Sequence, residues 1–293
     1  MPGKKLKIIV LSIIVFNVLA IAQEKNELVW HTVKEGEWSR LYLNNSPFPH
    51  SSRIDDYHYK SLVFTYRINY SDSSAIVFIP EGYKTKNGLN DMIVHFHGWN
   101  NEVLNVMHTF NLLPQLYNSG KNVILILAQG PKNAMDSAGG KIEEKNGLKK
   151  FINEILSDLY QDKKITTDKL GQLIISAHSG GYRPAILGLA NGGLQKNVKE
   201  IFLFDAFYDL TDKLIPWLKE DKDNKLRSIY TDHLAPEHRE FLKLISVHGL
   251  TYNNVLKPDT KIMLKYTRVC HDCVMEGTFE EWLKASSLSD IDR

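Results

Sequence analysis

The sequence predicts an α/β fold in which helices cover both faces of a mostly parallel β-sheet. Short apolar runs alternate with amphipathic segments from residue 91 onward, and this alternation is typical of strand–helix–strand units. The runs at 91–98 and 122–130 are built around the apolar stretches 92–94 and 123–128, as expected for short strands buried in a sheet. In residues 147–162 the apolar residues recur at helical spacing, which indicates a helix packed on such a sheet.

The remaining elements follow from the same patterns. The expected strands are 27–33, 39–44, 61–69, 74–80, 91–98, 122–130, 170–179, 200–208, 225–233 and 261–267. The expected helices are 101–120, 147–162, 184–193, 210–221, 236–249 and 278–287. The first four strands are separated by short polar turns, which favour hairpins, so we expect a mixed sheet.

The N-terminus has the layout of a secretory signal peptide. A basic stretch, MPGKKLK, precedes the apolar run 8–22, which ends in the small-x-small pattern Ala20-Ile21-Ala22. Fifteen apolar residues are short for a membrane-spanning helix, which needs roughly 20. We therefore expect cleavage after residue 22 and a secreted or periplasmic protein; the alternative is an uncleaved N-terminal anchor.

Residues 23–293 are expected to form one α/β domain, in which 23–60 could form N-terminal accessory strands. No linker rich in proline, glycine or serine divides this segment. The 293-residue chain carries 36 basic and 34 acidic residues, a net charge of +2. That balance argues against nucleic acid as a partner and against stable membrane association after signal cleavage. Cys270 and Cys273 are either free thiols or a local disulfide.

The stretch LIISAHSGGYRPA, residues 173–185, places Ser179 where a strand should turn into a helix. A serine hydroxyl needs a base to take its proton and a position clear of its own backbone. A sharp strand-to-helix turn provides that position, but it crowds the flanking residues, which must be small. Ala177 and Gly181 flank Ser179 at the required spacing. The Gly180 N–H is a candidate donor to an oxyanion.

A second oxyanion donor is expected from the loop after residues 91–98. That strand ends in His97-Gly98, and Trp99 follows. In sites of this kind the loop after such a strand supplies an N–H, and we assign it to Trp99. His97 and Tyr182 are candidate substrate contacts, because they adjoin the oxyanion loop and the serine turn.

The general base is expected late in the chain, and His271 lies in the loop after the last strand, just before the final helix. Its orienting acid is open between two aspartates. Asp232 ends the penultimate strand and Asp205 ends the strand before it. Either carboxylate could reach the same imidazole. We favour Asp232 narrowly, with Asp205 as the alternative.

In these features residues 60–290 resemble the α/β-hydrolase superfamily. The resemblance rests on the order Ser179, aspartate, His271, on the His97-Gly98 loop and on the AHSGG turn, in which Ala177 replaces the usual glycine. It implies a sheet of roughly eight strands and acyl transfer to water through an acyl-enzyme, without cofactor or metal. The export signal is similar to that of secreted bacterial esterases. We therefore expect a carboxylic-ester hydrolase acting on small-molecule or polysaccharide-linked esters, with amide or peptide cleavage as an option.

Two other classes of function compete with this interpretation. His95 and His97 lie two residues apart on one strand, so their side chains share a face and could hold a divalent metal of a metallohydrolase. Alternatively, the chain could be a non-catalytic binding protein that keeps the fold. The metallohydrolase hypothesis would leave the AHSGG turn without a function.

Overall fold

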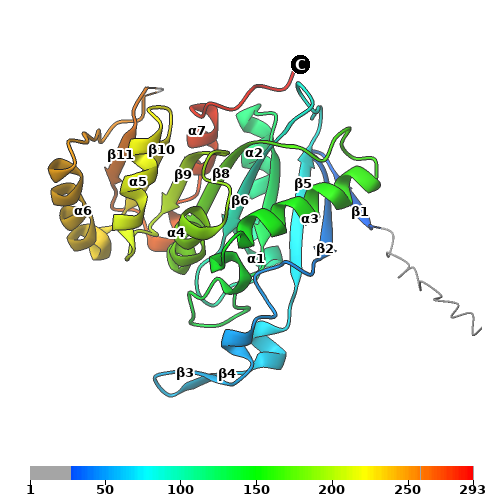
Figure 1. Ribbon diagram of the computed structural model, residues 1–293, viewed down its shortest axis with the longest axis horizontal. Coiled ribbons are helices and arrows are strands. Elements are labelled where there is room, and N and C mark those ends of the chain that lie inside the picture. Colours follow the sequence, from blue (N-terminus) through cyan, green and yellow to red (C-terminus); the bar gives the residue numbers. More distant parts are fainter. Residues whose placement is uncertain (1–27, 258, 293) are drawn as a thin grey trace, which may run out of the picture.

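A single mixed sheet organises the protein. The computed structural model describes residues 28–257 and 259–292, so the expected signal peptide, residues 1–22, lies outside the described residues. Within that part of the chain nine strands form one sheet in the order β1-β2-β5-β7-β6-β8-β9-β10-β11 (Figure 1). The α/β class and the mostly parallel sheet are confirmed, and the sheet has one strand more than the eight implied by the resemblance.

The strands of this sheet differ in direction between its two halves. Their bounds are β1 Trp30–Val33, β2 Gly36–Tyr42, β5 Ser74–Pro80, β6 Asn90–Phe96, β7 Ile124–Ala128, β8 Leu170–His178, β9 Val198–Phe204, β10 Lys225–Tyr230 and β11 Ile262–Tyr266. The pairs β1–β2, β2–β5 and β5–β7 are antiparallel. From β7 through β11 every neighbouring pair is parallel. The carboxyl ends of these strands therefore share one edge.

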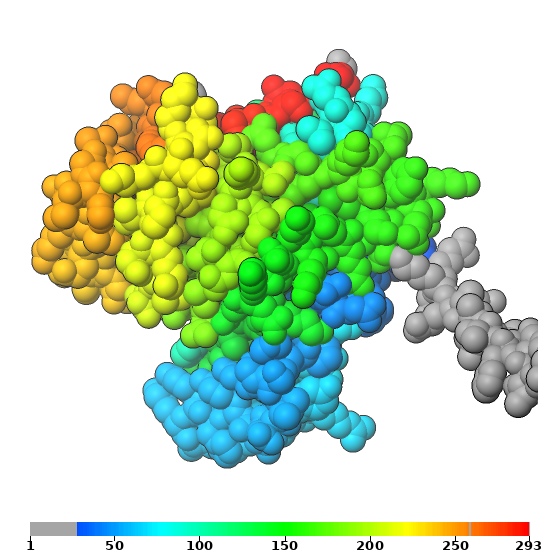
Figure 2. Space-filling view, in the orientation of Figure 1, coloured from blue at the N-terminus to red at the C-terminus, as the bar shows by residue number. Residues whose placement is uncertain are grey.

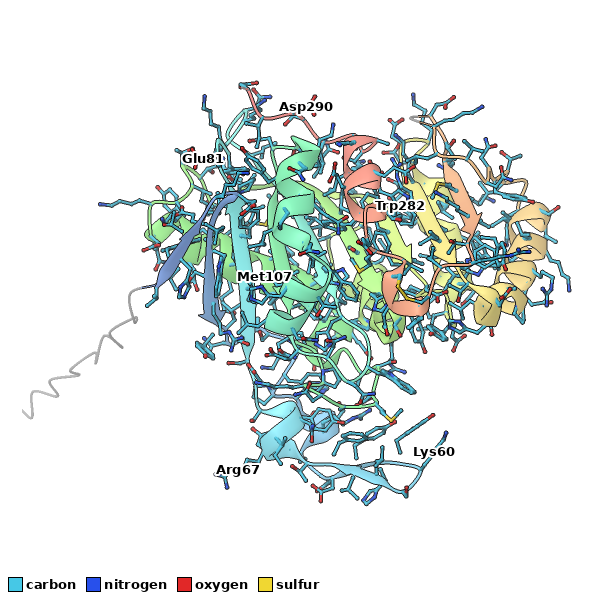
Figure 3. All side chains as sticks on the ribbon, turned by 180° about the vertical axis from the view of Figure 1, so that it is seen from behind. Lys60, Arg67, Glu81, Met107, Trp282 and Asp290 are labelled. Atoms are coloured by element: carbon cyan, nitrogen blue, oxygen red, sulfur yellow. A yellow bond between two sulfur atoms is a disulfide. The ribbon has the colours of Figure 1, made fainter. Side chains whose placement is uncertain are left out.

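Helices cover both faces of the sheet. Their bounds are α1 Val103–Thr109, α2 Leu112–Ser119, α3 Gly147–Gln161, α4 Tyr182–Asn191, α5 Leu214–Glu220, α6 Ala235–Val247 and α7 Thr278–Lys284. Side chains of α3, α4, α5 and α6 share one apolar core, and those of α1, α2 and α7 share the other. Figure 1 looks onto α3 and α4, whereas Figure 3 shows the opposite face, with Met107 on α1 and Trp282 on α7. No helix of the described residues combines the length and apolar character needed to cross a membrane.

Two expected elements differ from the structure. The helix expected at 101–120 is two helices, because Asn111 adopts a left-handed conformation with φ of 48° between α1 and α2. Asparagine tolerates this conformation better than most residues, so it interrupts a continuous apolar pattern. The strand expected at 61–69 is strand only at β4, Leu62–Phe64, and continues as a π-helical turn over Tyr66–Tyr70.

A small lobe projects from the body of the domain. Strand β3, Tyr57–Tyr59, pairs with β4 in a separate two-stranded sheet. Figures 1 and 2 show this hairpin standing out below the main sheet. Tyr59 contacts Trp99 edge-on, with ring centroids 5.1 Å apart, so the lobe reaches the loop that follows β6. The other N-terminal strands, β1 and β2, form the edge of the main sheet itself.

A buried ion pair fixes the C-terminal helix to the sheet. Arg227 of β10 lies 2.8 Å from the Glu200 carboxylate of β9, and both side chains are almost fully buried. Arg227 also donates to the carbonyl of Ala285 just after α7, and the other Glu200 oxygen accepts from the Ser287 N–H. Each charge therefore has a partner, which a buried charge requires.

Replacing Arg227 with Met leaves the Glu200 carboxylate buried without its cation. We expect the free energy of unfolding to fall by about 3–5 kcal/mol, as for other buried pairs that lose one partner. Urea denaturation followed by circular dichroism measures the change. Lys243→Met is the matched control, because Lys243 pairs with Glu240 on an exposed helix surface and such pairs contribute little. Equal losses for the two variants would contradict the role assigned to the buried pair.

Candidate active site

Ser179 occupies a tight turn between β8 and α4. Its backbone is left-handed, with φ of 51°, and a short 3-10 turn, Ser179–Gly181, connects strand to helix. Such a conformation is unfavourable for a residue with a side chain and is retained where the surroundings enforce it. A Cβ on Gly181 would collide with the Phe96 carbonyl, so the turn packs directly onto the end of β6. This geometry holds the serine side chain clear of the sheet.

The loop after β6 lies against this turn. A Cβ on Gly98 would come 2.7 Å from the Ser179 Cβ, so only glycine allows the loop to approach the serine so closely. The Asn100 N–H donates to the Ala134 carbonyl at 3.0 Å, while the Trp99 N–H has no backbone acceptor within the described ranges. The Trp99 N–H is therefore available as a donor in this loop beside Ser179.

His271 and Asp205 form a close pair at the carboxyl edge of the sheet. His271 Nδ1 lies 2.7 Å from Asp205 Oδ2, and the Asp205 carboxylate is fully buried. The Thr231 backbone N–H donates to Oδ1 at 2.9 Å, and the Thr231 hydroxyl donates to Oδ2 at 2.8 Å. Burial alone would raise the pKa of Asp205, but the hydrogen bonds from His271 and Thr231 together lower it. The acid therefore stays ionised and can stabilise a protonated imidazole.

The narrow preference for Asp232 does not match this geometry. Asp232 Oδ1 accepts from the Tyr266 hydroxyl at 2.7 Å on the protein surface, whereas Asp205, the alternative, contacts His271. Asp205 itself has a left-handed backbone, with φ of 46°. Asp232 begins a short 3-10 turn after Thr231. The sequence order allowed both aspartates, because the position of a carboxylate after a strand end depends on loop geometry that spacing does not encode.

His178, directly before the serine, fixes the loop that carries His271. Its Nε2 is 3.1 Å from the His271 carbonyl, so it donates there, and the two rings lie 4.8 Å apart. Burial, with the neighbouring His271, lowers the pKa of His178 to about 4. The ring is therefore neutral at physiological pH, and its hydrogen bond to the His271 carbonyl holds the segment that carries His271. This role was not predicted from the sequence, although His178 directly precedes Ser179 in the AHSGG turn.

His97 is not placed to contact a substrate in the cleft around Ser179. Its Nδ1 donates to the Gly98 carbonyl at 2.8 Å, and its Nε2 accepts from the Gly130 N–H at 3.0 Å. Burial lowers its pKa, which fits this neutral tautomer. His97 thus holds the oxyanion loop. His95 hydrogen bonds with the Ser176 hydroxyl inside the sheet.

Possible metal-ligating clusters do not include the pair His95 and His97. In the described part of the chain the groups with suitable spacing are His178, His271 and Asp272, and Asp205, His233 and His271. Both groups contain the histidine already paired with Asp205. The geometry therefore gives the metallohydrolase hypothesis no separate site at β6.

Tyr208 and His233 complete a hydrogen-bonded chain that was not predicted from the sequence. The Tyr208 hydroxyl lies 3.0 Å from His233 Nε2, and His233 Nδ1 lies 2.8 Å from the Thr231 hydroxyl. Tyr208 lines the same cleft as Ser179. Burial raises the pKa of Tyr208, and the neighbouring Ser179 hydroxyl offsets part of that rise. In the sequence Tyr208 is only one of several aromatic residues near the motifs. His233 gave no signal, because its loop conformation brings it there.

Two clefts meet at Trp99. The first, of about 560 Å³, contains the serine and its base; its lining includes Gly98, Trp99, Ser179, Tyr208, His233 and His271. The second, of about 540 Å³, lies under the β3–β4 lobe; its lining includes Arg53, Tyr57, Trp99, Asp136, Tyr182 and Arg183. The irregular stretch 130–147 therefore contributes to this second cleft, as does Tyr182. Figure 2 shows the lobe beside the body of the domain.

The cysteines form a local disulfide. Cys270 and Cys273 are bonded to each other, three positions apart, and they flank His271 in the loop after β11. The bond therefore restrains the segment that carries the histidine. Of the two states left open by the sequence, the structure has the disulfide.

No family model and no curated protein matches this chain in sequence. Solved structures do match its fold. An S-formylglutathione hydrolase from Agrobacterium tumefaciens covers 90% of this chain and 100% of its own, with a TM-score of 0.54 and 12% identity. The feruloyl esterase module from Clostridium thermocellum matches with a TM-score of 0.51 and 8% identity, and covers 90% of this chain and 98% of its own. A fluorophosphonate-binding serine hydrolase from Staphylococcus aureus matches with a TM-score of 0.50 and 13% identity. It covers 85% of this chain and 99% of its own. The chain thus has the α/β-hydrolase fold.

Asp205→Asn and Asp232→Asn separate the two candidate acids. We expect Asp205→Asn to lose roughly 10³- to 10⁴-fold in kcat/KM on an ester substrate, because the amide cannot hold the same tautomer or stabilise the imidazolium. Asp232→Asn should change kcat/KM less than about threefold, as expected for an exposed contact. Steady-state kinetics on one aryl ester measures both. A larger loss for Asp232→Asn would reverse the assignment.

Proposed function

We propose that this protein is a serine hydrolase that cleaves carboxylic esters through an acyl-enzyme on Ser179. The observation that carries the proposal is the convergence of three parts in one cleft: a serine on a strained turn, a histidine paired with a buried carboxylate, and a free backbone N–H. Nucleophilic catalysis by serine requires these three parts. A non-catalytic binding protein would have no use for them.

In this mechanism His271 takes the proton as Ser179 Oγ attacks the ester carbonyl. Asp205 stabilises the imidazolium and fixes its tautomer through the 2.7 Å contact to Nδ1. The N–H groups of Gly180 and Trp99 donate to the carbonyl oxygen and stabilise the negative charge that develops on it. His271 then protonates the leaving alcohol. Water enters, gives a proton to His271, and releases the carboxylic acid from the serine.

Esters are favoured over amides and peptides as the substrate class. The three solved structures compared above are named as an S-formylglutathione hydrolase, a feruloyl esterase module and a serine hydrolase, and none is named as a peptidase or amidase. The comparison supports the ester proposal through the fold alone, since identity is low. The substrate's acyl and alcohol groups are then constrained by the two clefts.

The second cleft favours a polar, extended alcohol such as a polysaccharide. Its walls combine aromatic faces, Tyr57 and Tyr182, with the ion pairs of Arg53 with Asp136 and of Arg183 with Glu143. Aromatic rings stack on sugar rings, and fixed guanidinium and carboxylate groups bind hydroxyls. Because Trp99 borders both clefts, a chain esterified at the serine site can continue into the second cleft.

Export completes the proposal. The basic start, the apolar run and the small-x-small pattern in residues 1–22 support a cleaved signal peptide. The Cys270–Cys273 disulfide is compatible with an oxidising compartment, where such bonds persist. The proposed mature protein therefore begins at Gln23 and resides in the periplasm or outside the cell.

A fluorophosphonate probe tests the nucleophile and the processing together. Protein purified from the exported fraction should have the intact mass of residues 23–293 and gain one probe adduct. Ser179→Ala should remain unlabelled, because the adduct forms on an activated serine. Well-folded wild-type protein that takes no adduct would remove the serine mechanism. A mass that includes residues 1–22 would contradict the proposed signal cleavage but would not affect the proposed serine mechanism.

Acetylated oligosaccharides of increasing length test the second cleft. We expect kcat/KM to rise about tenfold or more from an acetylated monosaccharide to the tetrasaccharide, because further sugars gain contacts across Trp99. The acetyl group and its bond to a sugar hydroxyl are the same in all members of the series, so only the length of the leaving alcohol differs. Rates independent of length would show that the second cleft does not bind the alcohol.

A further inference from the structure

The direction of each hydrogen bond between Asp205 and Tyr208 follows from the chemistry of the groups. The Asp205 carboxylate is ionised and can only accept, so the Thr231 hydroxyl donates its single proton to Oδ2 at 2.8 Å. The Thr231 oxygen must then accept from His233 Nδ1, which lies 2.8 Å away. Nδ1 of His233 therefore carries the hydrogen.

The same reasoning fixes the hydroxyl of Tyr208. In a neutral imidazole with its proton on Nδ1, Nε2 is an acceptor. The Tyr208 hydroxyl, 3.0 Å from His233 Nε2, must donate to it. The only hydrogen of that hydroxyl is thus directed to His233, on the wall of the same cleft, and not toward Ser179. What Tyr208 presents to the cleft that it shares with Ser179 is therefore an oxygen lone pair.

A lone pair at this place discriminates between the two molecules that occupy the site in turn. The leaving alcohol of the first step and the water of the second both exchange a proton with His271, so they occupy the same position. Water has a second hydrogen that can be donated to Tyr208. The alcohol oxygen has only the proton that it receives from His271. An acceptor here stabilises water and offers the alcohol nothing.

We propose that the Tyr208 hydroxyl, oriented by His233, accepts a hydrogen bond from the water that hydrolyses the acyl-enzyme and so favours hydrolysis over transfer to alcohols. The inference rests on the proposed serine mechanism. In the step, the water oxygen bonds to the acyl carbon while one proton passes to His271 Nε2 and the other stays on the oxygen, facing Tyr208. The bond from carbon to Ser179 Oγ then breaks, and Oγ recovers the proton from His271.

Thr231 and His233 are positioning residues in this arrangement. Both ring nitrogens of His233 are used, although its side chain is 47% exposed. That exposure leaves the imidazole in contact with solvent while it lines the cleft. The Asp205 carboxylate therefore orients two imidazoles: His271 directly, and His233 through Thr231.

The test is the partition of an acyl-enzyme between water and methanol. Wild type and Tyr208→Phe are given p-nitrophenyl acetate with a fixed concentration of methanol at about pH 8, where an ordinary imidazole is neutral. The ratio of methyl acetate to acetic acid is then measured. We expect the ratio to rise about three- to tenfold in Tyr208→Phe, because the attacking water loses one neutral hydrogen bond. A burst of p-nitrophenol should accompany it, because deacylation becomes slower.

The product ratio does not depend on how much of the sample is active, so a partly folded variant still gives a valid result. His233→Ala should shift the ratio in the same direction but less, since Tyr208 stays but loses its orientation. Tyr266→Phe is the matched control, because its hydroxyl bonds Asp232 outside the cleft, and its ratio should equal that of wild type.

An unchanged ratio in Tyr208→Phe, even with lower rates, would reduce Tyr208 to a structural residue and overturn the inference. A fall in the ratio would place its hydroxyl on the alcohol and overturn it as well. In both cases wild type still labels with fluorophosphonate and still partitions its acyl group, so the proposed function stands. Wild type that neither labels nor forms an acyl-enzyme would overturn both.

Discussion

The candidate site depends on one buried carboxylate. Asp205 contributes two oxygens that take the His271 imidazole, the Thr231 backbone N–H and the Thr231 hydroxyl. These groups come from the ends of β9 and β10 and from the loop after β11, which are neighbours in the parallel half of the sheet. A carboxylate buried without them would be neutral or would destabilise the fold. The charge that orients His271 therefore also connects the ends of three neighbouring strands.

The site also depends on close backbone contact between the oxyanion loop and the serine turn. Gly98 and Gly181 have no side chains, so the loop after β6 and the turn after β8 can touch. His97 reinforces the contact, because its ring bonds the Gly98 carbonyl on one side and the Gly130 N–H on the other. The strained φ of Ser179 is sustained by this packing. The close approach of these two segments follows from steric limits that only glycine satisfies.

Much of the fold and part of the site followed from sequence, and the reason differs for each. The parallel strands were predictable because buried strands are continuously apolar, and the serine turn because its neighbours must be small. The break in the helix at Asn111 could not be predicted, because one left-handed residue leaves the apolar periodicity on either side unchanged. The choice between Asp205 and Asp232 could not be predicted either, because both residues follow a strand. Only the backbone of the loop determines which carboxylate turns inward. The sequence correctly placed His97 beside the loop after β6. The predicted contact with substrate does not match its position, because its ring bonds Gly98 and Gly130 instead.

The residues that the sequence did not identify are those whose place in the site depends on hydrogen bonds between separate loops and strand ends. His178, His233 and Tyr208 come from three different loops or strand ends, and no motif spacing connects all three to Ser179. Their hydrogen bonds can be deduced only once the distances are known, because the acceptor-only carboxylate of Asp205 sets the direction of every proton up to Tyr208. One ionised group thus determines the tautomer of His271 and, through Thr231, the direction of the Tyr208 hydroxyl. In the proposed mechanism the base and the position for water are therefore both organised from the same buried charge.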